Sequence, residues 1–262
     1  MDTVRAATHF VETNATVEHL SFEFLPDEGV VAWSDGGAVV FSDVSFTGAA
    51  VALVGGEPRF SDTVIDAYFA VRDGAAPTVE DSEIIGHASV DGPGRTVIRD
   101  SLLHGGTSAS ADATGAYEDN HFIGQLLGVD SGSDMLVKGN LIEGVEEGAA
   151  IEVVGYGSSA EIVDNTIRDS VVGISIDSDE PGSTVVGNTI SDVRVGIHLD
   201  SEASVLVKDN TIEGADDFGL IFQGSGARVV DNSICGSGEA FEFRGGANPE
   251  IFSNDICAAL EP

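Results

Sequence analysis

Polar side chains that could act together as acids and bases recur at corresponding positions of short segments in the C-terminal half of the chain. Asp177 ends the segment Gly-Ile-Ser-Ile-Asp, and His198 and Asp200 belong to the related segment Gly-Ile-His-Leu-Asp. Glu242 lies in Ala-Phe-Glu-Phe-Arg, two repeats later. A histidine beside carboxylates can transfer protons to and from a bound substrate. We therefore take Asp177, His198, Asp200 and Glu242 as candidate catalytic residues.

Neighbouring polar residues could hold a ligand beside them. The candidate ligand-binding residues are Arg244, Gln223, Asp216 and Asp217. The alternative is that all these side chains form an ordinary polar face of an acidic protein, and composition alone does not separate the two interpretations.

A second set of carboxylates recurs every 19 residues in the N-terminal half. It contains Asp43, Asp62, Asp81, Asp100 and Asp119. If each interval is one structural repeat, these carboxylates form a line in which neighbours repel one another by roughly 1 kcal/mol in water. Calcium favours carboxylate oxygens and tolerates irregular geometry, so this line is a candidate calcium site. The alternative is a fully solvated line with no cofactor.

The elements that position these residues follow from an internal repeat. Asp-Asn-Thr-Ile and its variants place asparagines 22 or 23 residues apart at Asn165, Asn188, Asn210, Asn232 and Asn254. Each phrase is followed by a short segment of alternating apolar and polar residues, the pattern of a half-buried strand. A fixed period of 19 to 25 residues built from such strands indicates a solenoid. We predict an all-β fold, a right-handed parallel β-helix of about twelve coils, with residues 1–262 forming a single domain.

The asparagines have a structural role in this prediction. Asparagine tolerates the left-handed backbone conformation, and its amide can bond to the same amide in the next coil. We therefore expect a structural ladder of stacked amides. The isoleucines two positions later should stack inside, and these are Ile167, Ile190, Ile212, Ile234 and Ile256.

The two cysteines, Cys235 and Cys257, are 22 residues apart, which is one coil. Both follow an inward isoleucine, so they should lie side by side and face outward. Adjacent coils bring their backbones within disulfide range, although parallel side-chain directions make the fit imperfect, and a pair of free thiols is the alternative. Two adjacent exposed cysteines fit an extracellular or periplasmic setting.

Charge and hydropathy limit the partners. The chain has 45 acidic and 11 basic residues and a formal net charge of −34, which argues against binding to nucleic acid or to an anionic membrane surface. No apolar stretch approaches the roughly 20 residues needed to span a bilayer, and this sequence carries no signal peptide. The chain enters a coil almost at once, so we expect it to be part of a larger protein. The open ends of a solenoid allow either a monomer or an end-to-end oligomer.

The Asp-Asn-Thr-Ile and Gly-Ile-His-Leu-Asp phrases resemble the parallel β-helix repeat of the pectate-lyase-like superfamily, including its carbohydrate-binding and sugar-hydrolase domains and the NosD-like periplasmic proteins. The resemblance covers nearly the whole chain and implies the fold, with sugar polymers lying across the outward face of one sheet. Asp216-Asp217-Phe218-Gly219 is similar to the paired-aspartate phrase of polygalacturonases. The Gly-His-Gly and Arg-Ile-Lys phrases that accompany it there are absent from this sequence.

Two functional hypotheses follow. In the first, the chain is a non-catalytic extracellular module of a larger bacterial protein, acting as a spacer, an adhesive or a ligand-binding domain, with carbohydrate and calcium as candidate ligands. In the second, it is a glycoside hydrolase or lyase that acts on the outward face of one sheet. The first is favoured because no complete catalytic set is found and only short insertions, near residues 154–159 and 178–183, could wall a groove.

Overall fold

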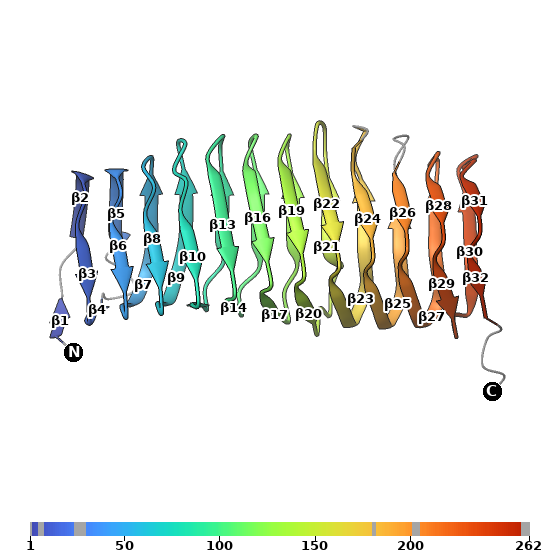
Figure 1. Cartoon of the computed structure of the whole chain (residues 1–262), viewed down its shortest axis with the longest axis horizontal. Helices are drawn as coiled ribbons and strands as arrows, with labels where there is room; N and C mark the ends of the chain where they lie inside the picture. The colour runs from blue at the N-terminus through green and yellow to red at the C-terminus, as the bar shows by residue number, and fades with distance from the viewer. Residues whose placement is uncertain (1, 5–7, 24–29, 180–181, 201–204, 258–262) are drawn as a thin grey trace. The chain divides into compact units, whose positions relative to one another are not determined.

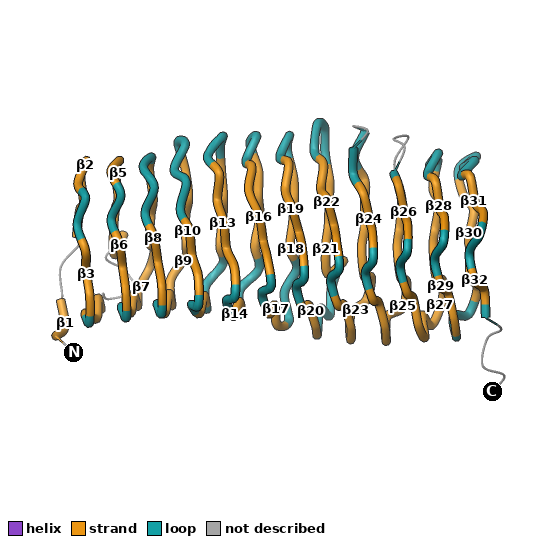
Figure 2. Tube along the Cα trace, viewed as in Figure 1, coloured by secondary structure: helices purple, strands orange, loops and turns teal. Residues whose placement is uncertain are grey.

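The computed structural model describes residues 2–4, 8–23, 30–179, 182–200 and 205–257. Its described residues form strands and turns (Figure 1). Strands and loops alternate along the whole described trace, with no helix and hence no helix that could cross a membrane (Figure 2). The chain divides into two compact units, Met1–Phe122 and Ile123–Pro262. The prediction of a single domain stays a prediction.

The first unit is built from parallel strands of successive coils. One sheet contains β1 (Asp2–Val4), β2 (Thr8–Thr13), β4 (Leu20–Glu23), β5 (Val30–Gly37), β7 (Ser45–Val54), β9 (Val64–Arg72), β11 (Glu83–Ile84), β12 (Ala88–Asp91), β14 (Leu102–Leu103), β15 (Thr107–Ser110) and β17 (His121–Ile123). The other contains β3 (Thr16–Glu18), β6 (Val40–Ser42), β8 (Arg59–Ser61), β10 (Thr78–Glu80), β13 (Arg95–Arg99) and β16 (Thr114–Glu118).

The second unit repeats this arrangement. Its first sheet contains β18 (Leu127–Asp130), β20 (Leu141–Glu143), β21 (Ala149–Val154), β23 (Thr166–Asp177), β25 (Thr189–Leu199), β27 (Thr211–Gln223), β29 (Ser233–Cys235), β30 (Glu239–Arg244) and β32 (Asp255–Ile256). The second contains β19 (Asp134–Lys138), β22 (Ser159–Val163), β24 (Thr184–Val186), β26 (Leu206–Lys208), β28 (Arg228–Val230) and β31 (Glu250–Phe252). The predicted all-β parallel β-helix is confirmed, with approximately the predicted number of coils.

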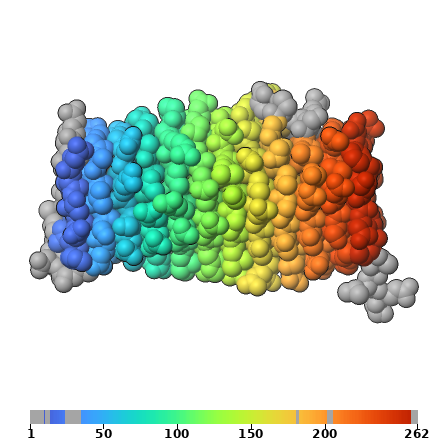
Figure 3. Space-filling view, viewed as in Figure 1, coloured from blue at the N-terminus to red at the C-terminus, as the bar shows by residue number. Residues whose placement is uncertain are grey.

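Columns of equivalent apolar side chains fill the interior of each unit. In the second unit Ile167, Ile190, Ile212 and Ile234 are in register and at most 1% exposed. Burying one such side chain contributes roughly 1.5–3 kcal/mol. Figure 3 shows the side chains of successive coils packed against one another within each unit. Ile256 was predicted to stack inside, but its side chain is 45% exposed. Among the described residues its strand, β32, pairs only with β29, so no further coil covers it.

The asparagines form a continuous chain of amide hydrogen bonds, which we call the asparagine ladder. Each Nδ2 donates to the Oδ1 of the next asparagine at 2.8–2.9 Å, from Asn140 through Asn165, Asn188, Asn210 and Asn232 to Asn254. The backbone N–H of each asparagine donates to the same oxygen. In the first unit Ser82 and Ser101 supply hydroxyl oxygens to the backbone of the preceding coil instead.

The left-handed backbone conformation does not fall on the asparagines, as the sequence prediction assumed, but on the residue before each. Asp164, Asp209 and Asp231 have φ of 54°, 55° and 59°, and Gly187 has φ of 69°. The side chains of these asparagines are buried in the coil, while the preceding residue makes the corner. Aspartate or glycine occupies each of these four corners because both tolerate a positive φ.

The same corner accounts for the regular aspartates of the first unit. Asp43, Asp62, Asp81, Asp100 and Asp119 all have φ between 49° and 54°, and all are exposed. Their spacing therefore follows from backbone geometry. Within the described part of the chain, no three acidic, histidine or cysteine side chains are grouped so that they could hold a metal ion.

Candidate functional site

The outward face of β23, β25, β27 and β30 brings the predicted polar residues into two columns. One column runs through Ser175, His198, Ile221 and Glu242, which are partners in register. The alternation that places them outward is fixed by buried neighbours on each strand, such as Ile197 and Leu199, both 0% exposed. The sequence pattern therefore predicts which side chains share this face.

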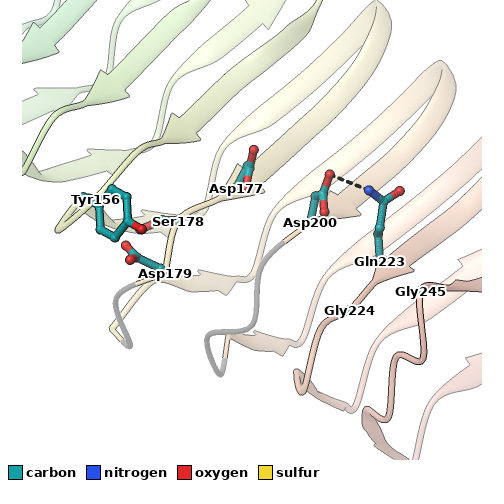
Figure 4. A pocket seen from close by; sticks show the side chains of 8 residues that line it. All are labelled: Tyr156, Asp177, Ser178, Asp179, Asp200, Gln223, Gly224 and Gly245. Carbon is teal, nitrogen blue, oxygen red and sulfur yellow. Dashed lines mark hydrogen bonds between the residues drawn. The ribbon is translucent and has the colours of Figure 1, made fainter.

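The second column runs two positions further along the same segments, through Asp177, Asp200, Gln223 and Arg244. It borders a recess of about 470 Å³ in the second unit. Its polar lining includes Asp177, Asp200 and Gln223, which come from the ends of three successive strands (Figure 4). The Gln223 amide donates to the Asp200 carboxylate, with 2.8 Å between Nε2 and Oδ2. This hydrogen bond orients the Asp200 carboxylate beside the Gln223 side chain.

Loop residues complete the recess. Tyr156 and Asp179 lie beside each other on one side of it in Figure 4. Tyr156 is 85% exposed, the largest exposure among the large apolar side chains of the described chain. Neither residue belongs to a repeated phrase, so the repeat did not reveal them. The available signal was the pair of short insertions at residues 154–159 and 178–183, which carry Tyr156 and Asp179.

The surroundings of His198 favour its neutral imidazole. Partial burial lowers the pKa of His198, and Arg244 lowers it further, while Asp200 and Asp177 oppose the shift. Its Nε2 is buried and has no hydrogen-bond partner among the described residues. A neutral imidazole with an unbonded nitrogen can accept or donate a proton, which is the chemistry expected of it from the sequence.

The pKa of the Asp177 carboxyl is raised, whereas that of the His198 imidazole is lowered. Burial raises the pKa of this carboxyl, the neighbouring Asp200 raises it further, and His198 lowers it. Asp177 remains an exposed side chain, so water screens much of this interaction. The arrangement of Asp177, Asp200 and His198 can supply hydrogen-bond acceptors, and it contains the group types needed for proton transfer.

Glu242 and Arg244 are paired with each other at 3.3 Å between Oε1 and Nε. The Arg244 guanidinium also lies 5.7 Å from the ring centroid of Phe218. These contacts hold both side chains over β30, at the edge of the face. Arg244 is partly exposed and can still bind an acceptor group of a ligand.

Asp216 and Asp217 are not brought into the recess. They occupy an irregular part of β27 where the register against β25 shifts between Val193 and Val195. Asp217 is paired with Arg194, with 2.6 Å between Oδ2 and Nη2, and Asp216 is exposed. The paired aspartates are therefore explained locally by a bulge and an ion pair.

Neither of the two cysteines lines the recess. Cys235 and Cys257 are joined by a disulfide with a Cα separation of 4.6 Å. The bond links β29 to the residue that follows β32, and so ties two successive coils together.

Comparison with known proteins identifies the architecture. No curated protein matches the chain. The family described as right handed beta helix region matches residues 126–258, which include both columns of the outward face, the recess and the disulfide. This match agrees with the parallel register and the all-β content described above. The chain belongs to the right-handed β-helix family.

Proposed function

We propose that this β-helix is a non-catalytic ligand-binding module of a larger extracellular bacterial protein, and that carbohydrate is its ligand. The observation that carries the proposal is the recess in which Asp177, Asp200 and Gln223 converge beside the exposed ring of Tyr156. Fixed carboxylate and amide groups beside an aromatic ring suit a ligand with many hydroxyl groups and an apolar face.

The placement of the carboxylates favours binding over catalysis. Glycoside hydrolysis needs two carboxyl groups that flank the scissile bond from different sides. Asp177 and Asp200 instead stand at the ends of neighbouring parallel strands of one sheet (Figure 4), so both approach a ligand from the same side. Glu242 is already paired with Arg244.

The extracellular part of the proposal is supported by the disulfide between Cys235 and Cys257. Such bonds persist mainly in oxidising compartments. The bond closes a coil of the same unit that carries the recess, so an oxidising setting would stabilise the binding unit.

Binding and turnover are measured on the same preparation. Hexamers of galacturonate, glucosamine and glucose are titrated by calorimetry, and each mixture is assayed for reducing ends and unsaturated products. We expect binding of at least one hexamer, without product, and at least about tenfold weaker binding by Asp177→Asn/Asp200→Asn. Asp231→Asn is the control, because this exposed aspartate has φ of 59°, which asparagine tolerates. Equal affinity of the double variant and the control would reject the recess as the binding site.

Catalysis is the second candidate, and the unbonded Nε2 of His198 favours it. In that case wild type releases product from one hexamer. His198→Gln, which keeps a polar side chain of similar reach, abolishes turnover while binding remains. Product formation that depends on His198 would replace the binding proposal with an enzymatic one.

A further inference from the structure

One face of the first unit differs in charge from the rest of the chain. Its outward residues, which we call the neutral face, are Ala50, Ala52 and Val54 on β7, Tyr68, Ala70 and Arg72 on β9, His87, Ser89 and Asp91 at β12, and Ser108 and Ser110 on β15. The inward positions between them are buried, for example Phe69 and Val71, and the small outward residues Ala52, Ala70 and Ser89 form the floor of the face, at 4–7% exposure. Only Arg72 and Asp91 carry full charges, and they lie 4.0 Å apart. The two charges of the neutral face cancel, although the chain as a whole has a net charge of −34.

A ring pair stands at one side of the neutral face. The rings of Tyr68 and His87 are nearly parallel, at 11°, with centroids 5.9 Å apart, and Tyr68 is 37% exposed. The Nε2 of His87 lies 3.1 Å from the Ser108 hydroxyl oxygen, which orients the imidazole. Burial lowers the pKa of His87 more than Asp91 raises it, which favours the neutral imidazole.

Small residues leave the outer faces of this ring pair accessible. In the preceding coil the strand partner of Tyr68 is Ala50. In the coil after His87 the nearest backbone is that of Gly106, whose carbonyl oxygen accepts a hydrogen bond from the Ala88 N–H. Neither residue has a side chain large enough to cover a ring. A flat, weakly polar ligand surface such as one side of a pyranose ring can therefore stack there.

Polar groups stand at the other side of the neutral face. Asp91 accepts hydrogen bonds from the hydroxyls of Ser89, at 2.9 Å, and Ser110. Arg72 extends beside it and is exposed. Tyr68 and Arg72 are four positions apart along β9, which is roughly 13 Å at the rise of a strand. Donors and acceptors at this distance from a ring suit a short chain of sugar units.

We propose that the neutral face is a second binding site, which takes an uncharged glycan by stacking one sugar ring on Tyr68 and bonding hydroxyls of the next units to Arg72, Asp91 and Ser110. The site belongs to the first unit and is separate from the recess of the second. An anionic polymer is disfavoured by the net charge of the chain. A cationic ligand finds no unpaired carboxylate on this face, because Asp91 is engaged by Arg72, Ser89 and Ser110.

Calorimetry with defined hexasaccharides tests the proposal. Cellohexaose, mannohexaose and xylohexaose are the neutral probes, and hexagalacturonate is the charged comparison. At least one neutral hexamer should bind wild type, and Tyr68→Ala should weaken that binding at least about tenfold, whereas Tyr68→Phe keeps the ring and most of the affinity. Val64→Ala is the matched control, because Val64 is on the same strand and 36% exposed but lies outside the neutral face.

Folding of each variant is checked by thermal unfolding before titration, and Tyr68→Leu replaces Tyr68→Ala if the alanine variant is unfolded. The proposal is overturned if no neutral hexamer binds, if the ring-deleted variant binds the neutral hexamers as tightly as Val64→Ala does, or if loss of the Tyr68 ring weakens binding of hexagalacturonate as much as binding of the neutral hexamers. Loss of affinity confined to the ring-deleted variant supports it.

Discussion

Replacing Asn188 by alanine removes one rung of the asparagine ladder. Asn188 is 0% exposed. Its Oδ1 accepts hydrogen bonds from the backbone N–H and the Nδ2 of Asn165, both at 2.9 Å. Its Nδ2 donates to the carbonyl of Ile162 and to Oδ1 of Asn210, also at 2.9 Å. The side chain therefore connects three successive coils.

The expected loss follows from the groups left without partners. In Asn188→Ala, two donors of Asn165 lose their acceptor inside the coil. A buried donor left unsatisfied costs about 1–3 kcal/mol, so these two donors together cost about 2–6 kcal/mol. The Asn210 oxygen loses less, because the Asn188 backbone N–H still donates to it. We expect the free energy of unfolding to fall by about 4 kcal/mol.

Urea unfolding followed by far-ultraviolet circular dichroism measures the global loss. Because repeat proteins can open one coil at a time, amide hydrogen exchange is measured as well and should accelerate around Asn165 and Asn188. Thr189→Ala is the control, since Thr189 is exposed and its backbone bond to Asn165 remains. Asn188→Asp has nearly the same shape but cannot donate, and it should destabilise at neutral pH at least as much as alanine.

The reasoning is refuted if Asn188→Ala costs less than about 1 kcal/mol, which is the scale of an exposed substitution. It is also refuted if Asn188→Asp is as stable as wild type, because the side chain would then act through its volume alone.

Three further changes have definite expected outcomes. Gly196→Ala should cost about 1–3 kcal/mol by urea unfolding, because its Cβ would lie 2.5 Å from the Gly219 oxygen and 2.8 Å from Ile212 Cγ2, whereas Gly226→Ala, with open space around it, should be neutral. Raising the NaCl concentration from about 0.05 M to about 1 M should raise the melting temperature, because salt screens the repulsion within the net negative charge. Calcium chloride at matched ionic strength should raise the melting temperature no further. A calcium-specific rise that is lost in the five-site Asp→Asn variant of positions 43, 62, 81, 100 and 119 would instead establish a calcium site. Because the folded-state pKa of His198 is below its unfolded value, stability is retained above the unfolded pKa, near 6.5, and falls as the pH drops through the folded pKa; His198→Gln should remove this acid-dependent loss in thermal scans.

The fold was predictable because the repeat imposes the same environment on every coil. Alternation around Ile197 and Leu199 was enough to place His198 and Asp200 on one outward face. Loop residues do not repeat, so Tyr156 and Asp179 were outside the reach of the pattern. The neutral face was missed for a related reason: Tyr68 and His87 occur in single coils, and their stacking depends on the register between two strands.

The regular aspartates show that a backbone constraint is sufficient to produce a line of carboxylates at coil spacing. A line of carboxylates at coil spacing suggested calcium, but twelve aspartates among the described residues have a positive φ, in both units and at more than one corner. Asparagine or glycine would satisfy the same backbone, so the corner explains the position of these residues and not their charge. A high net charge keeps a protein soluble, and we attribute the negative charge of these corner aspartates to that effect. Function is therefore better sought where polar groups depart from the repeat, and both proposed sites meet that criterion: Tyr156 with Asp179 in the second unit, and Tyr68 with His87 in the first.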